Sequence, residues 1–195
     1  MGITTEQIKE LRDLTGVSIM QCKKALEEAG GDLEKAKVIL QKLSKVAASK
    51  KGDRTLGAGT VASYIHAGGA VGSMLELQCE TDFVSNNEEF KALARELAMH
   101  VAASSPEFLS RDDVSEEAKK SATEVFEKEA EGKPEEIKAK IIEGKLDAHF
   151  KEKVLLDQGF IKTPEKTIND LVEEAIQKFG EKVIISRFAR FGVLE

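Results

Sequence analysis

Two adjacent glycines, Gly68 and Gly69, separate two stretches of alternating character at residues 60–66 and 71–80. Glycines readily adopt the positive φ angles of a tight hairpin turn, so the two stretches are predicted to pair as antiparallel strands. Closing on this turn pairs His66 with Val71, Tyr64 with Ser73, Ala62 with Leu75 and Thr60 with Leu77. One face of the ribbon then carries mostly apolar side chains, from Ala62, Tyr64, Leu75 and Leu77. The chain must therefore fold around an antiparallel sheet that has other elements packed on one face.

Before the hairpin, apolar residues at helical spacing predict three short helices within residues 1–46. Gly16 ends the first helix, Ser18 can cap the second, and Asp32 can cap the third. Because three helices in so few residues share only a small core, we interpret this module as a partner-binding platform.

Residues 47–57 are small, basic and glycine-containing, which predicts a linker that starts as helix and then becomes flexible. Residues 58–195 form the second domain. After the β-hairpin, helical patterns occur at residues 87–103, 114–131, 134–146 and 168–179, and a strand pattern occurs at residues 183–191. The helices at residues 114–131 and 134–146 could pair as a helical hairpin. The final strand could complete a three-stranded antiparallel sheet. The predicted fold class is therefore α+β.

The composition excludes several classes of protein. Apolar residues make up 41% of the chain, which is too many for a disordered tail, and no apolar run is long enough to predict a membrane span. The formal net charge is −6, and residues 1–54 carry only a slight positive excess. Direct nucleic-acid binding is therefore not expected, because it usually needs a strongly basic domain.

The two cysteines, Cys22 and Cys79, are too few for a disulfide scaffold and form no CxxC pair. We interpret them as small buried or half-buried thiols in a reducing compartment. The first residues show neither the basic nor the apolar region of a secretory signal. The predicted location is cytoplasmic.

Motifs that carry chemistry are not found in this sequence. The glycines at residues 68–72 match no phosphate-binding loop, and His66, His100 and His149 are too far apart in sequence for a metal-binding motif. No GxSxG elbow is present, and neither cysteine has the flanking residues of a known nucleophile. The sequence therefore predicts no catalytic residue, no metal site and no cofactor.

One short stretch, Thr81, Asp82, Phe83 and Val84, follows the second strand and precedes a helix. A phenylalanine at such a turn can point outwards as an apolar wedge beside a carboxylate. It can equally lie under the sheet, with Asp82 or Asn86 serving only as a helix cap, and residue types alone favour the buried alternative.

Five groups of residues, in order along nearly the whole chain, carry a resemblance to one family. They are Leu11, Arg12, Thr15, Gly16, Met20 and Cys22–Leu26 with Gly31, Asp32, Lys35 and Ala36; residues 77–84; Ala98–Ala103 with Pro106; residues 132–141 and 143–146; and Gly180 and Glu181 with residues 187–191. Together they resemble the translation elongation factor Ts family, in a short form with a single core subdomain.

This resemblance implies a ubiquitin-associated-type three-helix domain followed by an α+β dimerisation domain. It implies a guanine-nucleotide exchange factor, not an enzyme, that binds the GTPase elongation factor Tu with GDP, displaces Mg²⁺ and promotes GDP release. It assigns Mg²⁺ displacement to Thr81, Asp82, Phe83 and Val84. Partner contacts would fall in the first module, at Leu11, Arg12, Ile19 and Met20, although Ile19 and Met20 could equally be core residues. A homodimer and a 2:2 complex with Tu are also expected.

Two rival functions remain to be distinguished. A non-catalytic adaptor that uses only the three-helix module would bind a protein partner without affecting GDP release. A small enzyme with an unrecognised carboxylate site would instead have a small-molecule pocket lined by perturbed acidic groups. The residue patterns alone do not separate the adaptor from the exchange factor, whereas the motifs that resemble the elongation factor Ts family favour the exchange factor.

Overall fold

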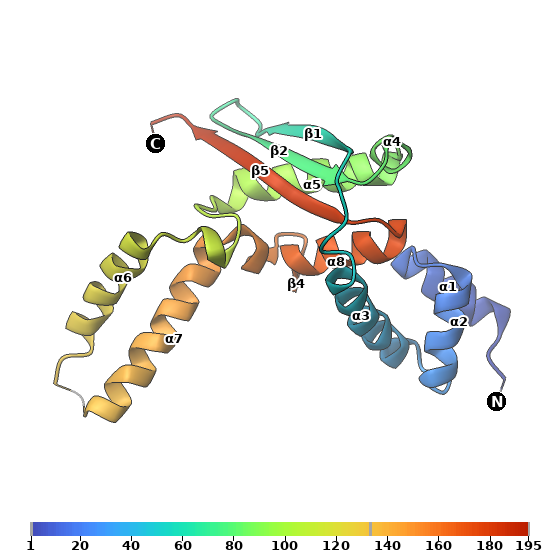
Figure 1. The fold of residues 1–195 in the computed structure, drawn as a ribbon, viewed down its shortest axis with the longest axis horizontal. Helices are drawn as coiled ribbons and strands as arrows, with labels where there is room; N and C mark the ends of the chain where they lie inside the picture. Colours follow the sequence, from blue (N-terminus) through green and yellow to red (C-terminus); the bar gives the residue numbers. More distant parts are fainter. Residues whose placement is uncertain (1, 133, 195) are drawn as a thin grey trace. The chain divides into compact units, whose positions relative to one another are not determined.

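The computed structural model describes residues 2–132 and 134–194 and combines helices with antiparallel strands (Figure 1). This confirms the predicted α+β class. The elements are α1 (Thr5–Thr15), α2 (Ile19–Glu28), α3 (Leu33–Ser49), β1 (Ala58–Ile65), β2 (Val71–Cys79), α4 (Asp82–Ser85), α5 (Glu88–Ser104), η1 (Arg111–Asp113), α6 (Glu116–Glu129), α7 (Glu135–Lys153), η2 (Leu155–Asp157), β3 (Gly159–Phe160), β4 (Thr163–Thr167), α8 (Ile168–Phe179) and β5 (Val183–Gly192).

The chain divides into two compact units, each built from segments that are distant in sequence. One unit comprises Met1–Ala62, Glu76–Ala94 and Asp170–Ser186, and the other comprises Ser63–Leu75, Arg95–Asn169 and Arg187–Glu195. Strands β1, β2 and β5 and helix α5 each run through both units. The domain limits at residues 46 and 57 remain a prediction.

The predicted helix boundaries at Gly16, Ser18 and Asp32 are confirmed. The Thr4 hydroxyl accepts from the Gln7 amide at the start of α1, and the Ser18 and Asp32 side chains cap α2 and α3 in the same way. Gly16 ends α1 in the left-handed conformation, at φ 68°. Helix α3 continues to Ser49, so the first part of the expected linker is helical.

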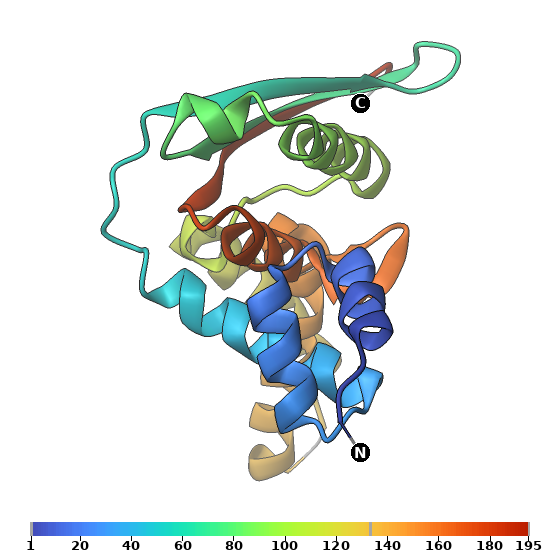
Figure 2. The same cartoon turned by 90° about the vertical axis from the view of Figure 1, so that its right-hand side faces the viewer.

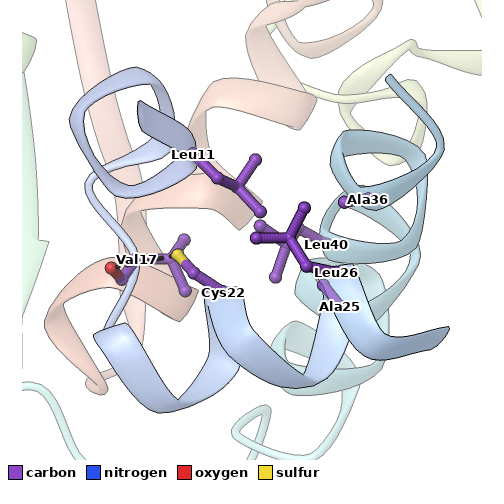
Figure 3. Packing of buried hydrophobic residues seen from close by; sticks show 7 residues of the cluster. All are labelled: Leu11, Val17, Cys22, Ala25, Leu26, Ala36 and Leu40. Carbon is purple, nitrogen blue, oxygen red and sulfur yellow. Dashed lines mark hydrogen bonds between the residues drawn. The ribbon is translucent and has the colours of Figure 1, made fainter. Parts of the chain in front are cut away.

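These helices share one small apolar core, drawn in Figure 3. Its buried members are Leu11, Val17, Cys22, Ala25, Leu26, Ala36 and Leu40. In the same unit, α8 meets this bundle through an ion pair between Lys45 and Asp170, with 3.6 Å between nitrogen and oxygen. The burial of Cys22 confirms its interpretation as a small core thiol, and Cys79 is likewise free and buried.

The β-hairpin closes as predicted. The His66 amide donates to the Val71 carbonyl at 2.8 Å, which confirms the pairing across Gly68 and Gly69. The sheet order is β1-β2-β5, so the last strand completes the sheet beside the second. Ala62, Leu75 and Leu77 are buried and Tyr64 is half-buried, as expected for the inner face. Helix α5 lies along the sheet (Figure 2), and the Ser73 hydroxyl donates to the Ala98 carbonyl at 2.5 Å.

In the other unit, α6 and α7 pack as the predicted pair of helices. Val114, Phe150 and Val154 form their buried cluster, and the Phe126 and His149 rings meet edge to face at 5.6 Å. Lys133, at the predicted break between the two helices, lies outside the described residues.

A two-stranded sheet, β3 paired with β4, was not predicted. Its strands are very short, and Pro164 breaks the usual strand pattern.

Candidate functional site

The stretch that follows β2 folds into one helical turn, α4, with Thr81 at its N-cap. We call residues 81–85 the wedge turn. Phe83 is 83% exposed, whereas the next residue, Val84, is only 4% exposed. Neighbouring residues of a helix point in directions about 100° apart, so a single turn can bury one and expose the other. The exposed alternative for Phe83 is therefore confirmed, and its role stays a prediction.

Backbone hydrogen bonds define the wedge turn. The Thr81 carbonyl accepts from the Ser85 amide at 3.2 Å and from the Cys79 thiol at 3.2 Å. The Asn86 amide donates to the Asp82 carbonyl at 2.9 Å. The suggested capping by Asp82 or Asn86 is corrected. Asp82 is the first residue of α4, whose N-cap is Thr81, and at the start of α5 the Glu89 amide donates to the Asn87 side chain at 2.8 Å. Burial, followed by the nearby Glu181 carboxylate, raises the pKa of the Cys79 thiol, which keeps it a neutral donor.

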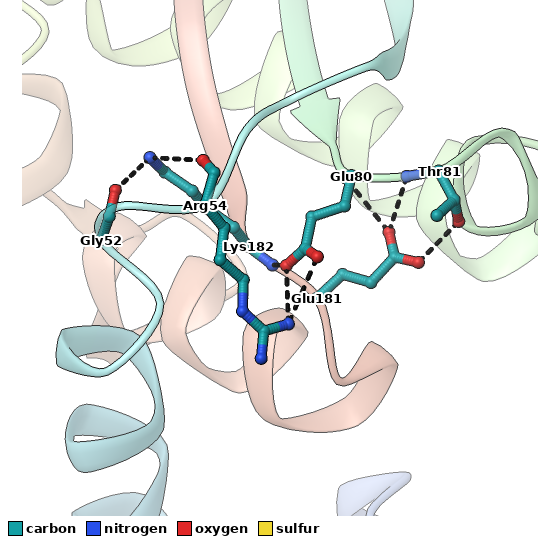
Figure 4. Close-up of polar contacts among 6 residues, drawn as sticks. All are labelled: Gly52, Arg54, Glu80, Thr81, Glu181 and Lys182. Atoms are coloured by element: carbon teal, nitrogen blue, oxygen red, sulfur yellow. Dashed lines mark hydrogen bonds and ion pairs between the residues drawn. The ribbon is translucent and has the colours of Figure 1, made fainter.

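The Thr81 side chain does not cap α4 but turns towards Glu181, in the short connection between α8 and β5 (Figure 4). One Glu181 carboxylate oxygen accepts from the Glu80 amide at 3.1 Å and from the Thr81 amide at 3.0 Å. The other accepts from the Thr81 hydroxyl at 2.5 Å. A single carboxylate therefore holds the entry to the wedge turn by three hydrogen bonds.

Glu80 is held from two further directions. The Lys182 amide donates to its carboxylate at 2.5 Å, and the Arg54 guanidinium donates to both of its oxygens at 3.1 and 3.2 Å. The hydrogen bond from the Lys182 amide, followed by the contacts with Arg54, holds the pKa of the Glu80 carboxyl below its ordinary value of 4.5. Glu80 therefore stays ionised at neutral pH.

The candidate contacts of the first module have different surroundings. Ile19 is 54% exposed and Met20 is 65% exposed at the start of α2, so the alternative that they are core residues is wrong. Arg12 is also exposed. Leu11 is fully buried in the core that Figure 3 shows, so its side chain supports the helix bundle instead of presenting a surface. Leu14 adds a further exposed apolar side chain to the end of α1.

Across residues 2–132 and 134–194, no group of three or more His, Cys, Asp and Glu side chains is arranged to hold a metal ion. No helix in the same part of the chain is long and apolar enough to cross a membrane.

The family model for elongation factor Ts matches residues 6–195. The chain belongs to the elongation factor Ts family. It is 48% identical over 194 residues to elongation factor Ts of Thermodesulfovibrio yellowstonii, covering 99% of this chain and 97% of that protein. It is 47% identical over 195 residues to elongation factor Ts of Thermosipho melanesiensis, covering 99% and 100% of the two chains. The elongation factor Ts of Carboxydothermus hydrogenoformans is 48% identical over 191 residues, covering 97% and 88%.

Membership of the elongation factor Ts family makes this chain a translation elongation factor and implies a partnership with elongation factor Tu. Sequence reasoning placed Glu181 in a family motif but assigned it no role. Its partner Thr81 lies 100 positions earlier in the chain, so no periodicity or local spacing could have revealed the contact.

Proposed function

We propose that this protein is the guanine-nucleotide exchange factor for elongation factor Tu. It binds the complex of Tu with GDP, displaces Mg²⁺ and promotes release of GDP, so that GTP can bind. The observation that carries this proposal is the 83% exposure of Phe83 on a turn whose backbone is held by Glu181. Membership of the elongation factor Ts family supports it independently.

The proposed mechanism needs no catalytic acid, base or metal ion of the factor's own. In a GTPase, Mg²⁺ bridges the phosphate oxygens and protein hydroxyls and neutralises their charge, so a shift of the elements around it weakens GDP binding. Phe83 acts by binding the displaced arrangement better than the GDP-bound one. The coupling is reciprocal, since a factor that weakens GDP binding is itself bound more weakly when GDP is present.

An exposed phenylalanine suits this task because it offers a large apolar surface with few rotatable bonds. An apolar gap in the partner would remove that surface from water, while the wedge turn holds the backbone behind it. Asp82 is exposed beside Phe83. Its negative charge can compete with the nucleotide phosphates for the Mg²⁺ ion.

The first module contributes affinity in this proposal, through the exposed apolar surface of Ile19 and Met20. This same surface favours the second candidate function, an adaptor that binds a partner without exchange. The adaptor hypothesis leaves the exposure of Phe83 and its anchoring unexplained. We further propose that the protein acts in the cytoplasm, where translation elongation takes place.

Stopped-flow release of a fluorescent GDP from elongation factor Tu, with and without this protein, tests the proposal. We expect the release rate to rise with factor concentration and to saturate. Binding to Tu without acceleration would support the adaptor and refute the exchange function. A result with neither binding nor acceleration would also refute the exchange function.

A further inference from the structure

Three segments that are distant in sequence meet beside the wedge turn (Figure 4). They are the residues after α3, the end of β2, and the connection between α8 and β5. We call their six interacting residues the polar clamp: Gly52, Arg54, Glu80, Thr81, Glu181 and Lys182.

Within the polar clamp, Glu181 is the member that touches the wedge turn directly. Its carboxylate takes both backbone amides at the entry to the turn as well as the Thr81 hydroxyl. Hydrogen bonds to an ionised acceptor are shorter and stronger than those between neutral groups. The same carboxylate therefore fixes the backbone at Glu80 and Thr81 and the rotamer of the Thr81 side chain.

Helix α4 cannot hold its own orientation, because it has only four residues and a single helical turn is unstable by itself. Inside the turn, Val84 and Ser85 are buried, while the Phe83 side chain extends into solvent. The direction of Phe83 is therefore set by the buried side of the turn and by the anchor at its start.

The other contacts of the polar clamp connect Glu80 and the residue after Glu181 to the segment that follows α3. The Lys182 amide binds Glu80, and the Lys182 ammonium donates to the carbonyls of Gly52 and Arg54. The Gly57 amide donates to the Cys79 carbonyl at 3.2 Å, which brings the chain after α3 against the end of β2.

We propose that Glu181 is a positioning residue for nucleotide exchange, which anchors the entry of the wedge turn so that Phe83 points at the partner. This inference rests on the proposed exchange function. Glu181 does not touch the nucleotide or the Mg²⁺ ion; it acts through Thr81 and the backbone.

The test compares full-length Glu181→Ala and Glu181→Gln with the unchanged protein. Glutamine keeps one acceptor oxygen but loses the charge and the second acceptor, so it should have an intermediate effect and serves if the alanine variant fails to fold. The matched control is Glu89→Ala, which removes a carboxylate of the same unit whose side chain pairs with Lys178 at 2.7 Å instead of with Glu80 and Thr81.

Two measurements are made on each variant. The first is hydrogen exchange of the Glu80 and Thr81 amides by NMR on the free protein, where Glu181→Ala should reduce protection about tenfold or more. The second is GDP release from Tu, where the rate at saturating factor should fall about fivefold or more, with a smaller change in the half-saturating concentration. Glu89→Ala should stay within about twofold in both.

Retained amide protection in Glu181→Ala would show that Glu181 does not anchor the wedge turn. Lost protection with normal GDP release would overturn the positioning role. If the unchanged protein does not accelerate release at all, the proposed function fails and the exchange role of Glu181 fails with it. The amide measurement would even then show whether Glu181 holds the turn.

Discussion

Phe83 and Val84 are neighbours in one helical turn with opposite surroundings, which makes them a matched pair for mutagenesis. Phe83→Ala should lower the rate of GDP release at saturating factor about tenfold or more, since an aromatic side chain supplies most of the apolar contact that such a wedge can make. Its melting temperature should hardly change, because the ring is 83% exposed and supports little of the fold. Stopped-flow kinetics and thermal unfolding on the same samples check both parts.

Val84→Ala is the control for this prediction. Val84 is 4% exposed, so its truncation should lower the free energy of unfolding by about 1–3 kcal/mol. If Phe83→Ala lost that much stability while its folded fraction still promoted GDP release normally, the wedge role of Phe83 would be contradicted.

His100 predicts a pH dependence of stability. It is fully buried, and its Nε2 donates to Gln158 at 2.9 Å while its Nδ1 accepts from the Ile161 amide at 3.4 Å, so the neutral ring fits its site. Burial lowers its pKa below the ordinary 6.5, and the hydrogen bond with Gln158 only partly offsets this. Below about pH 6.5, His100 therefore binds a proton in the unfolded chain but stays neutral in the folded chain.

The free energy of unfolding should consequently fall as the pH drops from about 7 to 5, by up to about 1.4 kcal/mol for each unit of pKa difference. Hydrogen bonds hold the pKa values of Asp32, Glu80 and Asp113 below their ordinary 3.8 to 4.5, so these groups titrate at lower pH. Urea unfolding at several pH values checks the slope, and His100→Gln should flatten it. An unchanged slope in the variant would assign the effect to other groups.

At the scale of elements, the start of α2 presents two neighbouring exposed apolar side chains, Ile19 and Met20. Replacing Ile19 and Met20 together by serine should raise the half-saturating concentration for Tu about tenfold and leave the saturated release rate unchanged. Stability should change by less than about 0.5 kcal/mol for each site, since both side chains are exposed. A titration of GDP release rate against factor concentration separates the two kinetic quantities.

Leu26→Ala is the control that disturbs the core of the same module instead of the exposed surface at Ile19 and Met20. Leu26 is fully buried in the three-helix core, and its truncation should cost about 2–5 kcal/mol of local stability. If the serine variant instead lowered the saturated rate at unchanged affinity, the first module would take part in exchange itself.

For the whole molecule, we predict a symmetric homodimer through the α+β core, since the chain has a single core copy and two-fold pairing is the commonest closed assembly. In the second unit, β5 ends in exposed apolar residues, with Phe191 70% exposed and Val193 beside it. Light scattering at micromolar concentration should give twice the mass of one chain, and a 2:2 complex with Tu. Phe191→Asp should shift the protein towards the monomer. A monomer for the unchanged protein, with no 2:2 complex, would refute the prediction.

The sequence by itself determined most of the local structure. Gly16 placed the end of α1, Ser18 and Asp32 placed the starts of α2 and α3, and Gly68 with Gly69 placed the hairpin and its register. These features depend on neighbours only a few positions apart, which a linear pattern records. The very short β3 and β4 escaped prediction, because two to five residues carry too little periodicity to be distinguished from a loop.

The tertiary structure alone decided which candidate residues face solvent and what holds them. Leu11 and Ile19 both fit an apolar helical stripe, yet one is fully buried and the other 54% exposed, because burial depends on which helix packs against which face. Residue types favoured a buried Phe83, and only the folded turn exposes it. The contact of Glu181 with Thr81 joins positions 100 residues apart, and it exists because the α8–β5 connection and the end of β2 meet in the folded chain.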